Sequence, residues 1–162
     1  MIILGADLSW TRTGLVWIDE NCKSLHEATV EIPPSTRRCC KALGAYQAAV
    51  KEGPTPTDYC LIEAPFESKA KGVNLMLMEL QGIFKAVLDF NGIDYMAERD
   101  QVKWLTATSI KKFITGSGKA EKADVAAALK EHFGLEFAND KGHDLSDAAA
   151  VAVWGVEWRK RL

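Results

Sequence analysis

The chain opens with a short apolar run that ends in an acid, and this pattern constrains its fold more than any other. The run covers residues 2–6 and leads directly into Asp7, and a second apolar run follows at residues 15–19. A short segment with Ser, Thr and Gly residues separates the two runs, which is typical of a β-hairpin. Asp7 then stands at the end of a buried strand, where its side chain would point toward water or a cation. The alternative is that Asp7 only starts the turn, because Asp is a common turn residue.

Further along the chain, short apolar runs alternate with longer helical patterns. Residues 25–32 could add a third strand, and the buried run at residues 59–63 ends, like the first strand, in an acid, Glu63. A long helix is expected over residues 72–90, and residues 93–97 are the last candidate strand. A meander followed by alternating helices and strands predicts an α/β fold, with one mixed sheet of about five strands flanked by helices.

Composition limits the classes of protein to which the chain can belong. Its 162 residues, 48% of them hydrophobic, predict a single globular domain over residues 1–162. The net charge of −2 argues against a protein that coats polyanions, so any nucleic-acid surface must be a local patch. No apolar stretch approaches the ~20 residues that a membrane span requires, so no membrane contact is expected.

The cysteine pattern indicates the redox state of the thiols. The chain has four cysteines, at positions 22, 39, 40 and 60, without a C-x-x-C pair. This spacing argues against a zinc site, and two cysteines that are neighbours in the chain rarely bridge each other. We therefore expect reduced thiols and a cytoplasmic location.

The C-terminal half carries a basic segment with two short helices. Residues 109–114 are expected to form a helix capped by Thr108. A glycine turn then leads into a second helix, with Lys119 and Lys122 expected on one side of its first turn. Backbone N–H groups and ammonium groups that point the same way suit a phosphate backbone. The alternative is a solvated lysine face without a ligand.

The last helix, expected to run to about Trp158, begins with two acids. Asp144 and Asp147 are three residues apart and therefore face the same way on a helix. They resemble a capping box, and the same helical turn could also present both carboxylates to a cation. The neighbouring His143 could be a surface residue, a capping neighbour or a substitute ligand.

Four acids lie far apart in the chain but all stand at the ends of expected strands or helices: Asp7, Glu63, Asp144 and Asp147. If the fold brings them together, their charges repel and raise one another's pKa values. Divalent cations remove this cost, and oxygen ligands of this kind suit Mg²⁺, with Mn²⁺ as a substitute. Two such ions roughly 4 Å apart activate a water and stabilise the leaving oxygen in phosphodiester hydrolysis.

Several short motifs follow one another in a fixed order along the chain. They are Gly5-Ala6-Asp7 with Thr13-Gly14, Ile62-Glu63 with Phe66, Gln81-Gly82, Ile110-Lys111, residues 115–122, and Asp144 with Asp147-Ala148. In this order and spacing they resemble the RuvC family of Holliday-junction resolvases, and the resemblance runs nearly end to end. It implies an RNase H-like nuclease fold.

The resemblance also implies roles for individual residues. The acidic metal ligands would be Asp7, Glu63, Asp144 and Asp147. Lys111 and Lys122 match the family's basic residues near the scissile phosphate, where they would hold the strand and offset developing charge.

Other residues would contact DNA. Phe66 matches an aromatic residue that stacks on a base at the open crossover, and the alternative is a phenylalanine buried in the core. Lys69 and Lys71, in the same loop, would touch backbone phosphates. The remaining expected DNA contacts are Lys112, Ser117 and Lys119.

The activity implied by the resemblance is that of a crossover junction endodeoxyribonuclease. A homodimer would make paired symmetric nicks across a four-way (Holliday) junction, and the helix over residues 72–90 is the candidate interface. The segment Leu8-Ser9-Trp10 replaces the Pro-containing turn that is common after the family's first acid.

Two alternatives stay open at this point. One is a nuclease of the same fold that cuts flaps, other branched DNA or RNA–DNA hybrids. The other is a catalytically silent junction-binding module. A branch-migration partner is not identified by the sequence.

Overall fold

The computed structural model describes residues 1–63, 71–96 and 105–160. The elements, in chain order, are β1 (Ile2–Asp7), β2 (Arg12–Asp19), β3 (Ser24–Glu31), α1 (Arg38–Glu52), β4 (Tyr59–Ile62), α2 (Lys71–Phe90), β5 (Asp94–Met96), α3 (Ala107–Thr115), α4 (Lys122–Phe133) and α5 (Asp144–Arg159).

The strands form one mixed sheet in the order β3-β2-β1-β4-β5. The first three strands are an antiparallel meander, while β4 pairs with β1, and β5 with β4, in parallel. Ala6 of β1 is opposite Ile62 of β4, so Asp7 and Glu63 follow at the same edge of the sheet, on neighbouring strands. The predicted α/β fold with a five-stranded mixed sheet is confirmed.

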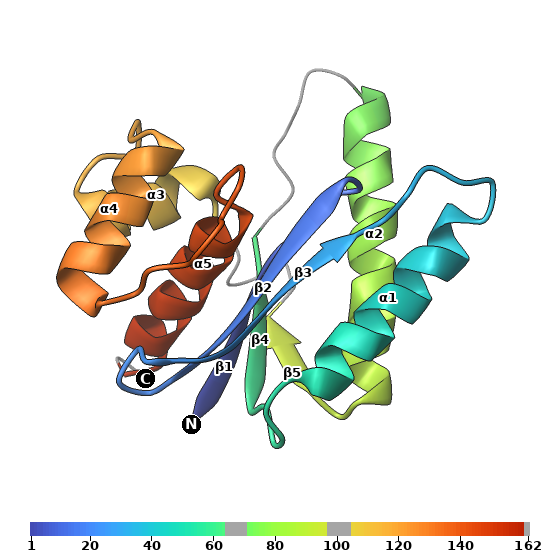
Figure 1. Cartoon of the computed structure of the whole chain (residues 1–162), viewed down its shortest axis with the longest axis horizontal. Coiled ribbons are helices and arrows are strands. Elements are labelled where there is room, and N and C mark those ends of the chain that lie inside the picture. Colours follow the sequence, from blue (N-terminus) through green and yellow to red (C-terminus); the bar gives the residue numbers. More distant parts are fainter. Residues whose placement is uncertain (64–70, 97–104, 161–162) are drawn as a thin grey trace.

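Helices cover both faces of the sheet, with α3, α4 and α5 on one side and α1 and α2 on the other (Figure 1). Alternate strand residues point to opposite faces, as the pleat of a strand requires. Ile3 and Leu61 join the core under α5, whereas Leu4 and Cys60 join the core under α1 and α2. By the same alternation Asp7 and Glu63 belong to the α5 face, two positions beyond Gly5 and Leu61.

Helix α5 lies directly on the backbone of β1 and β2 because two glycines leave room for it. A Cβ atom placed on Gly5 would stand 2.1 Å from the carbonyl oxygen of Ala148, and one placed on Gly14 would stand 2.1 Å from that of Asp144. Any side chain at either position would push the helix away from the sheet. The first turn of α5 is therefore fixed beside the carboxyl end of β1.

The ends of the basic helices differ from those expected. Helix α3 begins at Ala107, and its cap is Thr106, whose side chain accepts a hydrogen bond from the N–H of Ser109 at 3.2 Å. The predicted cap, Thr108, lies within the helix instead, because the extended residue that precedes α3 is two positions earlier. Within the described ranges, no helix is both long and apolar enough to cross a bilayer.

Candidate active site

Three of the four predicted acids line one cavity. Asp7, Glu63 and Asp147 share with Lys111 and Lys122 the wall of a cavity of about 210 Å³, enclosed by the ends of β1 and β4 and by α3, α4 and α5. The acids come from two neighbouring strands and from the helix that rests on them. Segments that are distant in the sequence thus bring their carboxylates to one place.

The two strand acids are costly to ionise in this position. Burial, followed by the charge of Asp147, raises the pKa of Asp7 to about 7. Burial, followed by the charge of Asp7, raises the pKa of Glu63 to about 7. The repulsion expected between clustered carboxylates therefore contributes to both raised pKa values, but desolvation contributes more.

Two lysines stand at the wall of the same cavity. The Nζ atom of Lys122 is 2.5 Å from Oδ2 of Asp147, and it also donates to the carbonyl of Gly142 at 3.2 Å. Burial alone would lower the pKa of Lys122, but the hydrogen bond to Asp147 and the nearby carboxylates outweigh it and raise the pKa. Lys111 donates to the carbonyl of Ala120 at 2.8 Å.

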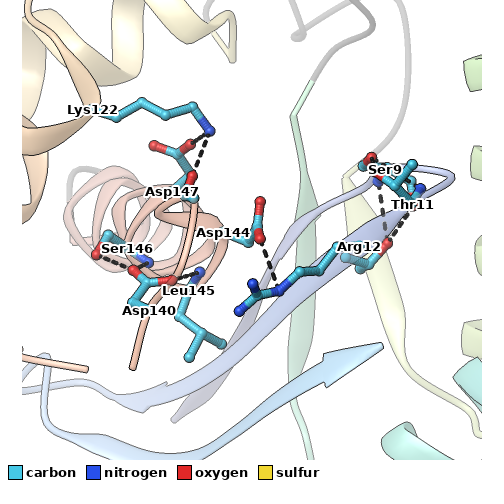
Figure 2. Close-up of polar contacts among 11 residues, drawn as sticks. Ser9, Thr11, Arg12, Lys122, Asp140, Asp144, Leu145, Ser146 and Asp147 are labelled. Carbon is cyan, nitrogen blue, oxygen red and sulfur yellow. Dashed lines mark hydrogen bonds and ion pairs between the residues drawn. The ribbon is translucent and has the colours of Figure 1, made fainter. Parts of the chain in front are cut away.

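The fourth acid, Asp144, lies apart from the cavity and has a different basic partner. Its Oδ2 atom is 3.1 Å from Nε of Arg12, the first residue of β2. Figure 2 shows Asp147 turned toward Lys122 and Asp144 turned toward Arg12. Burial raises the pKa of Asp144 although the charge of Arg12 acts in the opposite direction. The expectation that both acids of α5 face one pocket is thus met by Asp147 and not by Asp144.

The donor set suits a divalent cation in chemistry, although the side chains do not converge on one point. Carboxylate oxygens are the ligands that Mg²⁺ and Mn²⁺ prefer, and a bound cation would offset the cost of ionising Asp7 and Glu63, which burial and the neighbouring acids impose. Among the described residues, no three His, Cys, Asp or Glu side chains form a group that could hold an ion. Asp144 and Asp147, in the first turn of α5, each have a basic side chain beside them instead.

The first turn of α5 is held by a residue that the sequence did not single out. Asp140 accepts hydrogen bonds from the N–H groups of Leu145 (3.0 Å) and Ser146 (2.9 Å) and from the hydroxyl of Ser146 (2.6 Å), as Figure 2 shows. The residue at the cap position is His143, at φ 64°, without a capping hydrogen bond from its side chain. The predicted capping box is therefore wrong: Asp144 lies inside the helix, and Asp140 satisfies the free N–H groups.

The turn that follows Asp7 is anchored to the other side of the sheet. The hydroxyl of Thr13 donates to the carbonyl of Ser9 at 3.1 Å and shares a buried hydrogen bond of 2.8 Å with Tyr46 of α1. The indole N–H of Trp10 donates to the carbonyl of Met76 in α2 at 2.7 Å. These contacts hold the β1–β2 turn, and with it the end of β1, in one position.

The predicted DNA contacts are only partly described. Phe66 and Lys69 lie outside the described residues, and Lys71 begins α2 without a described side chain. Lys112, Ser117 and Lys119 are exposed, on or beside α3. Lys119 precedes α4 and is not in its first turn, contrary to expectation.

The amino end of α4 is not the open phosphate site that was expected. The N–H of Glu121 donates to Oδ2 of Asp124 at 2.9 Å, and the two residues form a capping box. Acids of the chain itself therefore occupy this helix end.

Comparison with known proteins identifies the family of the chain. A family model described as "Crossover junction endodeoxyribonuclease RuvC" matches residues 3–154. The chain belongs to the RuvC family. A protein of Bifidobacterium adolescentis named "Crossover junction endodeoxyribonuclease RuvC" is 30% identical over 159 residues, which are 94% of this chain and 78% of that protein.

Solved structures show the same fold. The structure of Thermus thermophilus RuvC matches with a TM-score of 0.75 at 20% identity, over 99% of this chain and 97% of that one. The structure of T. thermophilus RuvC in complex with a Holliday junction substrate matches with a TM-score of 0.79 at 20% identity, over 99% and 96% of the two chains. The fold of the chain is therefore the RuvC fold, which is RNase H-like.

The raised pKa of Asp7 predicts a pH-dependent effect of Asp7→Asn on stability in EDTA. Between the ordinary pKa of 3.8 and the folded value of about 7, the folded protein binds more protons than the unfolded chain, so Asp7 makes stability fall as pH rises. We expect Asp7→Asn to raise the free energy of unfolding by roughly 1–3 kcal/mol at alkaline pH, with the gain lost below about pH 4.

Urea unfolding at several pH values measures this effect. Asp89→Asn, at an exposed position of α2, is the matched control and should leave the free energy of unfolding almost unchanged. The prediction fails if Asp7→Asn lowers the free energy of unfolding at alkaline pH, or raises it by the same amount at acid pH. Either result would show that the fold does not penalise the ionised form of Asp7.

Proposed function

We propose that the chain is an endonuclease that uses divalent cations to cut four-way DNA junctions by phosphodiester hydrolysis. Membership of the RuvC family supports the activity, because the curated relative is named as a crossover junction endodeoxyribonuclease. The observation that supports the proposed chemistry is the cavity in which the half-buried Asp7 and Glu63 lie with Asp147 and two lysines.

The carboxylates of Asp7, Glu63 and Asp147 are proposed to hold the cations, with Asp144 as the fourth ligand. Bound Mg²⁺, or Mn²⁺ in its place, would activate a water for attack and neutralise charge on the leaving oxygen. The helix and strands carry these carboxylates on a rigid support, because α5 contacts the backbone of β1 and β2 directly. The backbone that carries these carboxylates then needs little reorganisation when the substrate binds.

The lysines are proposed to act on the phosphate. Lys122 has a side chain that is 49% exposed and already stands at the cavity wall, so it can contact a phosphate that enters the cavity. Lys111, on α3, also lines the cavity and is held by its hydrogen bond to the carbonyl of Ala120. Positive charge at these two points would offset the charge that develops on the phosphate in the transition state.

The remaining contacts to branched DNA are proposed from the sequence alone. Phe66 would stack on a base, and the following residues would contact the phosphate backbone: Lys69, Lys71, Lys112, Ser117 and Lys119. The exposure of the last three residues supports their availability to DNA.

The four free cysteines support the proposed cytoplasmic location, because reduced thiols are the rule in that compartment.

Cleavage of an immobile four-way junction with Mg²⁺ tests the proposal most simply. We expect paired nicks in the junction and none in linear duplex of the same sequence, with a flap and an RNA–DNA hybrid as further substrates. Glu63→Gln should lower the cleavage rate by roughly 100-fold or more and leave junction binding in EDTA intact, because it removes one charged ligand and keeps the shape.

Glu52→Gln, at the exposed end of α1, is the control and should cleave normally. Full cleavage by Glu63→Gln would refute the assignment of the cavity. If the flap or the hybrid is cut faster than the four-way junction, that nucleic acid is the preferred substrate and the junction is not.

We also propose that the active form is a homodimer that pairs through α2. Of the large apolar side chains that are described and exposed, most belong to this helix: Leu75 (68%), Met76 (46%), Met78 (59%) and Phe90 (78%). Exposed apolar patches of this kind mark interaction surfaces, and a two-fold dimer would present one cavity to each strand of a symmetric junction.

The dimer predicts that Met78→Glu shifts the protein to the monomer, because a buried charge in an apolar interface is costly. Sedimentation velocity measures the shift. Leu43→Glu, at an apolar position of α1 that is 39% exposed, is the matched control and should stay dimeric. A wild-type protein that sediments as a monomer at micromolar concentration would contradict the proposal.

A further inference from the structure

Arg12 is a charged residue on the face of the sheet that α5 covers. It begins β2, where Val16 and Ile18 point into the core beneath α5 and Gly14 contacts the start of that helix. The alternation of strand residues places Arg12 on the same face. Its guanidinium therefore meets the first turn of α5, where Asp144 is its partner (Figure 2).

The contact between Arg12 and Asp144 is shielded from water but is not a tight pair. The two side chains are only 24% and 16% exposed, and their closest atoms, Nε and Oδ2, are 3.1 Å apart. Within the described part of the chain, the buried Nε atom has no hydrogen bond of good geometry. The pair thus rests on charge and lacks the two parallel hydrogen bonds of a strong arginine–carboxylate pair. The carboxylate in such a pair can leave the guanidinium for another positive charge.

The backbone of Asp144 has little freedom, so only its side chain can change partners. The carbonyl of Asp144 lies against Gly14, and the hydrogen bonds of Asp140 fix the helical turn that begins with Asp144. Asp147, three residues further, already lines the cavity. Arg12 consequently decides whether the carboxylate of Asp144 is turned to β2 or is available to the other acids.

We propose that Arg12 is a positioning residue that holds the carboxylate of Asp144 on the β2 side and competes for it with divalent cations. This inference rests on the proposed metal-dependent function. It assigns to Arg12 control over the affinity of the site for cations. The other charged groups that interact with Asp144 are Lys122, Asp140, Asp147 and Asp7, and they remain in place when Arg12 is replaced. Loss of Arg12 therefore adds one uncompensated negative charge beside the cavity.

Binding of Mn²⁺ to the DNA-free protein, followed by electron paramagnetic resonance, measures this control without any cleavage. Arg12→Gln should bind Mn²⁺ roughly 5- to 20-fold more tightly than the wild type, because the ion no longer displaces a guanidinium. Arg12→Lys keeps the charge and should stay near the wild type. Arg37→Gln, at an exposed position before α1, is the control and should change nothing.

A second pair of variants separates competition for Asp144 from a general effect of charge. Because both members of this pair lack the ion pair, the comparison between them is also free of any folding defect that loss of the ion pair causes in Arg12→Gln. In an Asp144→Asn background, the added change Arg12→Gln should no longer tighten Mn²⁺ binding, because the contested carboxylate is gone. An equal gain in both backgrounds would overturn the proposal, since Arg12 would then act only through its charge.

DNA binding in EDTA distinguishes the remaining outcome. If Arg12→Gln weakens junction binding and leaves Mn²⁺ affinity unchanged, Arg12 is a phosphate contact and the proposal is wrong. If the wild type binds Mn²⁺ and shows the Arg12 effect but cuts no junction, the proposed function fails while the role of Arg12 stands.

Discussion

The parallel pairing of β1 with β4 places two carboxyl groups side by side at a poorly hydrated position, and the other features of the site depend on this constraint. Asp7 and Glu63 follow the ends of these neighbouring strands on the same face of the sheet. Burial is the main reason that the pKa of each rises to about 7, and the charge of a nearby acid adds to it. A fold that keeps both acids there carries a cost in stability above neutral pH unless a cation is present.

Helix α5 completes the site because it can approach the sheet so closely. Gly5 and Gly14 let the helix rest on the backbone of two strands, and Asp140 fixes its first turn. Each acid of that turn has a basic neighbour: Lys122 at Asp147 and Arg12 at Asp144. Half of the acid cluster is thus compensated by the chain itself, whereas Asp7 and Glu63 form no ion pair within the described part of the chain.

The sequence predicted those parts of the molecule that depend on local pattern. Apolar runs that end in an acid identified Asp7 and Glu63, and the alternation of strands and helices predicted the mixed sheet. Asp140 was missed because its role depends on a loop that bends back at His143, in a left-handed conformation that the residue type does not indicate. Arg12 was missed because the second strand was expected to begin at residue 15. Since β2 begins at Arg12, the alternation that carries Gly14 and Val16 extends to this arginine.

Protons that Asp7 and Glu63 hold near neutral pH would have to leave before a divalent cation could bind to both carboxylates. Calorimetric titration of the DNA-free protein with Mg²⁺ at pH 7, in two buffers of different ionisation enthalpy, counts the protons released. Because the pKa of each acid is about 7, we expect the release of about one proton per cavity when Mg²⁺ binds. Binding of Mg²⁺ without any proton release would contradict this expectation.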